Sequence, residues 1–159
     1  MNSKEKRFYT VRGYELLEKD RNNLTPSMED YLEMACRLSK VKNYTRIGDL
    51  AAALNVQPPS VTSMIKKLSN MDLVNYEKYA IVMVTDKGRE LGDYLLERHE
   101  IIEKFLTLIS DENILQETEK LEHTLGPKTI KGLSMIVYLF ENNEDFITAL
   151  RNMKENDHG

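Results

Sequence analysis

Cysteine, glycine and proline are scarce in this sequence, and tryptophan is absent. Its 159 residues include one cysteine, seven glycines and four prolines. A single cysteine excludes an internal disulfide framework and is typical of a reducing compartment. A membrane-spanning helix requires about 18 consecutive apolar residues, and no apolar run in the sequence is that long. The N-terminal stretch MNSKEKRFYT lacks the apolar core of a secretory signal. We therefore expect a cytoplasmic protein with no membrane partner.

The net charge of the chain is negative, but it is unevenly distributed. The formal charge of −4 argues against nucleic acid as a partner if it is spread evenly. Residues 40–90, however, carry eight Lys/Arg against five Asp/Glu, whereas residues 91–125 carry three against nine. A basic segment followed by an acidic one indicates two tasks in two regions.

Helical periodicity dominates the chain, so we expect a mainly α fold. Thr25-Pro26-Ser27 is a typical helix start, and Asn55-Val56-Gln57 breaks two short helices apart. Residues 73–85 are rich in β-branched and aromatic residues, which predicts two short strands. The later helices are predicted over about 86–109, 114–124, 128–140 and 143–153, with Thr85 capping the first of them.

Two short helices, a tight turn and a hairpin make a winged helix-turn-helix unit with a small β-hairpin wing. The second helix of such a unit enters the major groove of DNA, where small polar and cationic side chains reach bases and phosphates. The alternative is an ordinary solvated helix face and a surface hairpin. The predicted DNA-binding residues, on the second helix and at the hairpin tip, are Pro59, Ser60, Thr62, Ser63, Lys66, Lys67, Lys78 and Tyr79.

The acidic region carries side chains that could bind metal. Glu119, Glu122 and His123 stand at i, i+3 and i+4 of one predicted helix, and therefore on one face. His99 lies within the apolar stripe of the long helix over 86–109. Taken separately, a Glu-rich face is commonly solvated, and a lone histidine on an apolar face is more often a core residue.

The first helix adds Asp30 and Glu33 at i, i+3. Together the three helices offer four carboxylates and two imidazoles, and two divalent cations would neutralise the four negative charges. Oxygen-rich sites with histidine suit Mn²⁺ or Fe²⁺, and the lack of thiolate ligands disfavours structural zinc.

Residues 25–140 resemble the bacterial metal-responsive repressors of the diphtheria-toxin-repressor family, and most closely its manganese transport regulators. The matching segments are TPSMEDYLE (25–33), PPSVTSMIKKL (58–68), YEKY (76–79), TDKG (85–88), RHE (98–100) and ETEKLEH (117–123). The chain differs in carrying an N-terminal extension over residues 1–24. The resemblance implies a DNA-binding domain over 25–90 and a helical metal-binding and dimerisation domain over 91–159.

By this resemblance, the six acidic and histidine residues above correspond to the ligands of a dinuclear manganese site. The iron-responsive branch has Met where Asp30 stands and Cys where Glu119 stands, so the two oxygen ligands here favour Mn²⁺. Fe²⁺, Zn²⁺, Cd²⁺ and Co²⁺ are alternative metals. The family architecture also implies a homodimer, for which the expected seam is Ile130, Leu133, Ile136, Val137 and Phe140.

The sequence therefore predicts a manganese-dependent repressor, not an enzyme, that binds double-stranded operator DNA as a homodimer and controls manganese uptake genes. Three alternatives remain at this point. They are an Fe²⁺-responsive regulator of the same family, a metal-independent winged-helix regulator, and a dinuclear carboxylate enzyme. The last would use Glu-x-x-His pairs on two helices, whereas here Glu119 precedes His123 by four positions.

Overall fold

The computed structural model describes residues 19, 21–110 and 112–157 of the chain. Its elements divide into two compact units, one ending at Glu97 and the other beginning at Arg98, so that the division falls inside one long helix. Most of the predicted extension over 1–24 lies outside the described residues. Among the described helices, none has the length and apolar character that crossing a membrane would require.

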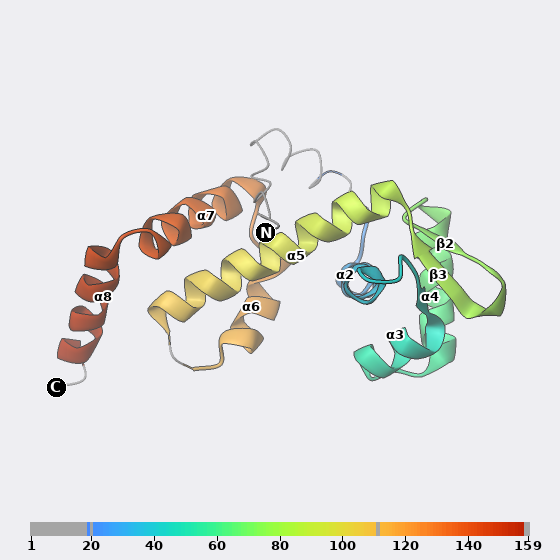
Figure 1. Ribbon diagram of the computed structural model, residues 1–159, viewed down its shortest axis with the longest axis horizontal. Helices are drawn as coiled ribbons and strands as arrows, with labels where there is room; N and C mark the ends of the chain where they lie inside the picture. The colour runs from blue at the N-terminus through green and yellow to red at the C-terminus, as the bar shows by residue number, and fades with distance from the viewer. Residues whose placement is uncertain (1–18, 20, 111, 158–159) are drawn as a thin grey trace. The chain divides into compact units, whose positions relative to one another are not determined.

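Helix α2 (Pro26–Ser39), labelled in Figure 1, lies in the first unit and starts where the sequence predicts. The Thr25 side chain accepts a hydrogen bond from the backbone N–H of Met28 at 3.3 Å, which satisfies one of the free donors at the helix start. Arg21, which precedes the helix, forms a buried ion pair of 2.6 Å with Glu29 in the first turn of α2. This pair fixes the chain segment that leads into α2.

The helix-turn-helix consists of α3 (Ile47–Leu54) and α4 (Pro58–Asn70). The turn between them depends on Asn55, which adopts the left-handed conformation at φ 53° and ψ 46°. Asparagine tolerates this conformation better than most residues. Its N–H bonds to carbonyls at the end of α3, so the predicted break at 55–57 is confirmed as a tight turn.

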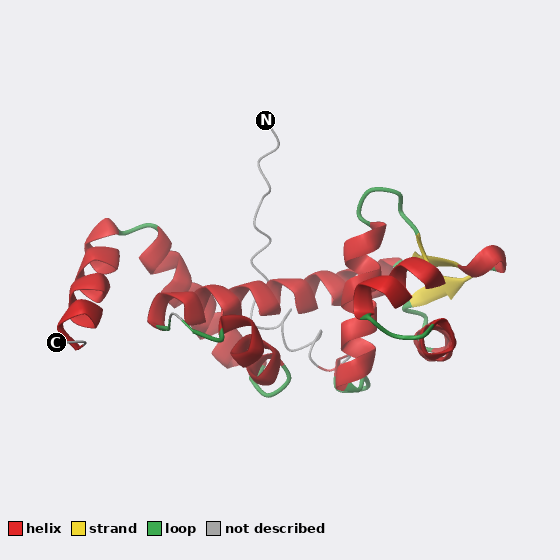
Figure 2. Cartoon of the chain, turned by 90° about the horizontal axis from the view of Figure 1, so that it is seen from below, coloured by secondary structure: helices red, strands yellow, loops and turns green. Residues whose placement is uncertain are grey.

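The wing is a three-stranded antiparallel sheet in the order β1-β3-β2, and not only the expected hairpin. Strands β2 (Val74–Tyr76) and β3 (Ile81–Val84) form the hairpin, whose tip is the short helical turn η1 (Lys78–Ala80) (Figure 2). Strand β1 (Thr45–Arg46) pairs with the other side of β3. Two residues are too few to show alternation in the sequence, which explains why β1 was not predicted.

Helix α5 (Asp86–Ile109) has the predicted bounds, and Thr85 Oγ1 accepts from the N–H of Gly88 at 3.0 Å as its cap. Gly88 lies so close to the Leu73 carbonyl that a Cβ would overlap it. This close approach sets the start of α5 against the turn before β2.

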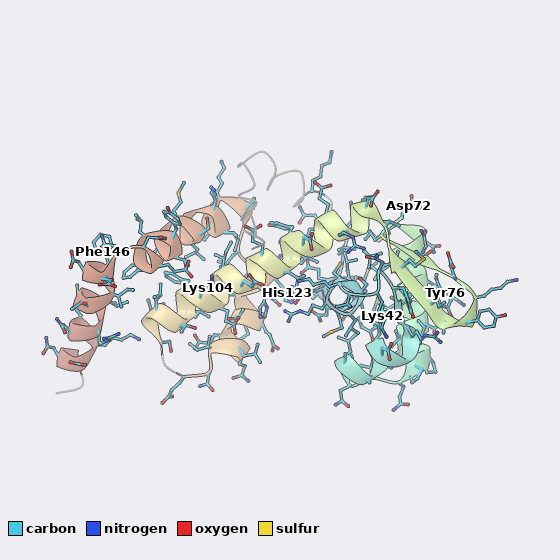
Figure 3. All side chains as sticks on the ribbon, viewed as in Figure 1. Lys42, Asp72, Tyr76, Lys104, His123 and Phe146 are labelled. Carbon is cyan, nitrogen blue, oxygen red and sulfur yellow. The ribbon has the colours of Figure 1, made fainter. Side chains whose placement is uncertain are left out.

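The second unit contains the end of α5, then α6 (Ile114–Glu122), α7 (Pro127–Glu141) and α8 (Glu144–Asp157). Pro127 is at the first turn of α7, where its missing N–H breaks no helical bond. The rings of Phe140 and Phe146 lie 5.8 Å apart, which joins α7 to α8. Phe146 is labelled in Figure 3. The later helices are thus confirmed, with small differences in their bounds.

Candidate functional site

The second unit brings His99, Glu122 and His123 together. His99 Nδ1 lies 2.7 Å from Glu122 Oε2, and His123 Nε2 lies 3.6 Å from Glu122 Oε1. The Glu122 side chain is only 6% exposed, and those of His99 and His123 are 13% and 24% exposed. Each oxygen of one buried carboxylate therefore faces an imidazole nitrogen, although His99 and Glu122 lie 23 positions apart in the sequence.

The other predicted ligands are placed on their expected helices. Glu119 lies on α6, one turn before Glu122, and is exposed. Asp30 and Glu33 lie on α2 in the first unit; Asp30 is exposed and Glu33 is half-buried. Glu33 forms an ion pair of 2.7 Å with Arg37, one turn further along α2.

The donor set of the second unit suits a divalent metal of borderline to hard character. It consists of imidazole nitrogens and a carboxylate, the ligand types found with Mn²⁺, Fe²⁺ and Zn²⁺. Thiolate chemistry is excluded because Cys36, the only cysteine, is buried in the first unit. Burial raises the pKa of its thiol to about 12, and its Sγ lies 3.8 Å from the Gly88 carbonyl oxygen. Cys36 therefore stays protonated, whereas a metal ligand must be a thiolate.

The predicted recognition helix α4 separates its residues onto two faces. Val61, Ile65 and Leu68 are fully buried. The opposite face carries the predicted DNA-binding side chains, of which Pro59, Ser60, Ser63, Lys66 and Lys67 are exposed and Thr62 is half-buried. The Thr62 hydroxyl donates to the Pro58 carbonyl at 3.1 Å, so it retains only its acceptor capacity for another partner.

The wing tip presents Lys78 and Tyr79, both exposed, as the sequence predicts. Tyr79 is 84% exposed and, like Ala80 after it, has a positive φ, at 63° and 60° respectively. Non-glycine residues rarely adopt this conformation, and it is found where structure or function demands it. An aromatic ring held outward on such a tip can contact a nucleic-acid backbone or groove.

Two further residues of the first unit, Arg46 and Arg37, were not predicted to belong to a functional site. Arg46 is exposed on β1 at the start of α3, beside the helix-turn-helix. The Glu33–Arg37 pair was also overlooked, although its i, i+4 spacing is the ordinary signal for an ion pair on a helix.

The residues of the predicted dimer interface on α7 differ in how far they are buried within the chain. Ile130 and Val137 are buried within the chain, whereas Ile136 is 40% exposed. Leu133 and Phe140 are half-buried. An adjoining apolar face that was not predicted is more exposed, and it consists of Met135, Tyr138 and Leu139.

Comparisons with known proteins agree with this two-part arrangement. Residues 23–82 match the iron dependent repressor N-terminal DNA binding domain, and residues 85–156 match the iron dependent repressor metal binding and dimerisation domain. Both descriptions are of transcriptional repressors, which confirms the prediction of a regulator rather than of an enzyme.

Individual relatives point the same way. The HTH-type transcriptional regulator MntR of Geobacillus thermodenitrificans is 44% identical over 138 residues, which cover 85% of this chain and 98% of that protein. The solved structure of the manganese regulator SloR is similar with a TM-score of 0.62 and 34% identity, over 72% of this chain and 55% of that one. The structure of ScaR with bound Zn²⁺ has a TM-score of 0.59 and 34% identity, over 69% and 53%. The chain thus spans about half the length of these two solved proteins.

Proposed function

Since the chain belongs to the iron-dependent repressor family of metal-dependent transcriptional regulators, we propose that it is a manganese-activated repressor of manganese uptake genes. It acts in the cytoplasm on double-stranded operator DNA. The observation that carries the proposal is the buried Glu122 carboxylate between His99 and His123 in the metal-binding and dimerisation domain. Burying a charged carboxylate between imidazoles costs it the solvation by water, and a bound metal ion would offset this cost.

The proposed site takes ligands from both units and holds two Mn²⁺ ions per subunit. His99, Glu119, Glu122 and His123 would supply one side, and Asp30 and Glu33 on α2 the other. Support comes from the chemistry of these donors, because four carboxylates balance the charge of two dications. Oxygen donors at Asp30 and Glu119 favour Mn²⁺. The solved relative SloR is named a manganese regulator, and ScaR a manganese-activated repressor.

The switch follows from the distribution of the ligands over the two domains, which we place at 25–90 and 91–159. Without metal, the carboxylates that share the proposed site would repel one another. Metal replaces this repulsion with coordination and fixes each winged unit relative to the dimer. In that arrangement the two recognition helices of a homodimer can sit about 34 Å apart and enter successive major grooves.

The homodimer is proposed to form through α7. Because Ile130 and Val137 are already buried within the chain, the contact is carried by Ile136 together with Met135, Tyr138 and Leu139, which are 40% to 57% exposed. Apolar side chains this exposed on one helix are typical of an interface.

The proposed function is tested by measuring operator binding of chelator-treated protein with added metals. We expect Mn²⁺ to raise DNA affinity by at least about tenfold, since allosteric coupling is commonly 5–150-fold, and Fe²⁺ to do so less. Because coupling is reciprocal, operator DNA should tighten Mn²⁺ binding by the same factor. Equal DNA affinity with and without Mn²⁺ would contradict a switch, and stronger activation by Fe²⁺ would favour an iron-responsive regulator.

The proposed DNA contacts predict a second result. Lys66→Ala and Lys67→Ala should each weaken binding to all DNA sequences, and each should lower the slope of log affinity against log salt by about 1. Fluorescence anisotropy with operator and unrelated DNA, at several salt concentrations, measures both effects. The control is Lys104→Ala on α5, an exposed lysine of the other unit (Figure 3). An unchanged salt slope in both α4 variants would place α4 away from the phosphates.

A further inference from the structure

The Glu33 carboxylate on α2 is held by Arg37. Nε and Nη2 of Arg37 donate to Glu33 Oε1 at 3.1 and 2.7 Å. Both bonds reach the same oxygen, so Oε2 has no part in the pair. The Glu33 side chain is 16% exposed and that of Arg37 is 45% exposed, which places the pair at the edge of the surface and not fully in solvent.

This pair differs from an ordinary ion pair on a helix surface because one partner is a proposed metal ligand. A metal bound through both oxygens of Glu33 has to displace the guanidinium from Oε1. A metal bound through Oε2 alone does not displace the guanidinium, but it then has one carboxylate oxygen as a ligand and not two. The fixed positive charge of Arg37 also repels a dication at the same carboxylate.

We propose that Arg37 is a positioning residue that restricts Glu33 to one metal-binding oxygen and thereby limits the affinity of the site for Mn²⁺. This inference rests on the proposed function, because it takes Glu33 as a ligand. Arg37 itself does not contact the metal. It acts by occupying Oε1.

The restriction also affects the choice of metal. Mn²⁺ prefers six ligands rich in oxygen, whereas Zn²⁺ is satisfied with four and accepts nitrogen donors readily. An extra carboxylate oxygen therefore benefits Mn²⁺ more than Zn²⁺. Arg37 consequently lowers the preference of the site for Mn²⁺ over Zn²⁺.

The test replaces Arg37 with methionine, which keeps a long helix-forming side chain and removes the charge and the donors. We expect Arg37→Met to tighten Mn²⁺ binding by about three- to tenfold, as loss of a charge-assisted hydrogen bond at the carboxylate would allow, and to tighten Zn²⁺ binding less. Titration calorimetry of the chelator-treated full chain measures the two affinities. Arg37→Lys keeps the charge but loses the planar fork of donors. Its Mn²⁺ affinity should therefore lie between that of the unchanged chain and that of Arg37→Met.

The matched control is Lys104→Met. Lys104 pairs with Glu141 at 2.9 Å and is 46% exposed, so it resembles Arg37 in exposure but pairs with no proposed ligand. The Mn²⁺ affinity of Lys104→Met should equal that of the unchanged chain. If Arg37→Met binds Mn²⁺ no more tightly than Lys104→Met does, or gains equally for both metals, the inference is overturned. A failure of the proposed function is distinguishable, because operator binding by the unchanged chain would then not respond to Mn²⁺.

Discussion

Replacing His99 with alanine is expected to abolish the response of DNA binding to Mn²⁺ while leaving a folded protein with weak, non-specific DNA affinity. His99 supplies one of the two imidazoles that face Glu122. Since even the partners of metal ligands contribute about 10–100-fold to metal affinity, loss of His99 as a proposed ligand should weaken Mn²⁺ binding by at least about 100-fold. Calorimetry gives the metal affinity, and anisotropy with operator DNA gives the response.

The control for His99→Ala is Glu100→Ala, the next residue of α5, which is exposed and outside the proposed ligand set. It should retain full Mn²⁺ activation. His123→Ala provides a second test, because His123 is more exposed and its removal disturbs packing less. Circular dichroism establishes that each variant is folded. Normal activation of folded His99→Ala and His123→Ala by Mn²⁺ would remove both histidines from the site.

Replacing Gly88 with alanine is expected to destabilise the protein by about 3 kcal/mol, at the upper end of what overpacking of a core usually costs. A Cβ at this position would overlap the Leu73 carbonyl oxygen. That oxygen belongs to the backbone and also accepts from the N–H of Thr85 at 3.1 Å, so it cannot move without breaking the junction between the wing and α5. The free energy of unfolding from urea denaturation measures the loss.

The same substitution at Gly48 is the matched control for Gly88→Ala. Gly48 lies in α3, and a Cβ there would meet no atom within 4 Å. Gly48→Ala should therefore stabilise the protein by up to about 1 kcal/mol through helix propensity. A similar effect of the two substitutions would show that α5 does not need its close approach to Leu73.

The helices could be predicted because their limits depend on interactions within a few residues. Thr25 and Thr85 cap the helices that follow them, and Asn55 ends α3, as the sequence indicates. The winged unit was likewise predictable from the order of its elements. Strand β1 was not, because its two residues form a strand only by pairing with β3, more than thirty positions later.

The side chains of the candidate site were predictable as residue types, since their spacing places them on particular helix faces. What the sequence alone determined is therefore a mainly helical chain with a winged DNA-reading unit and a set of carboxylates and imidazoles fit for a divalent metal. Only the tertiary structure decided that Glu122 is buried between His99 and His123, because packing of α5 against α6 joins residues 23 positions apart. It also decided which side of α7 is buried, since that depends on which helices pack against it and not on the apolar pattern of α7 itself.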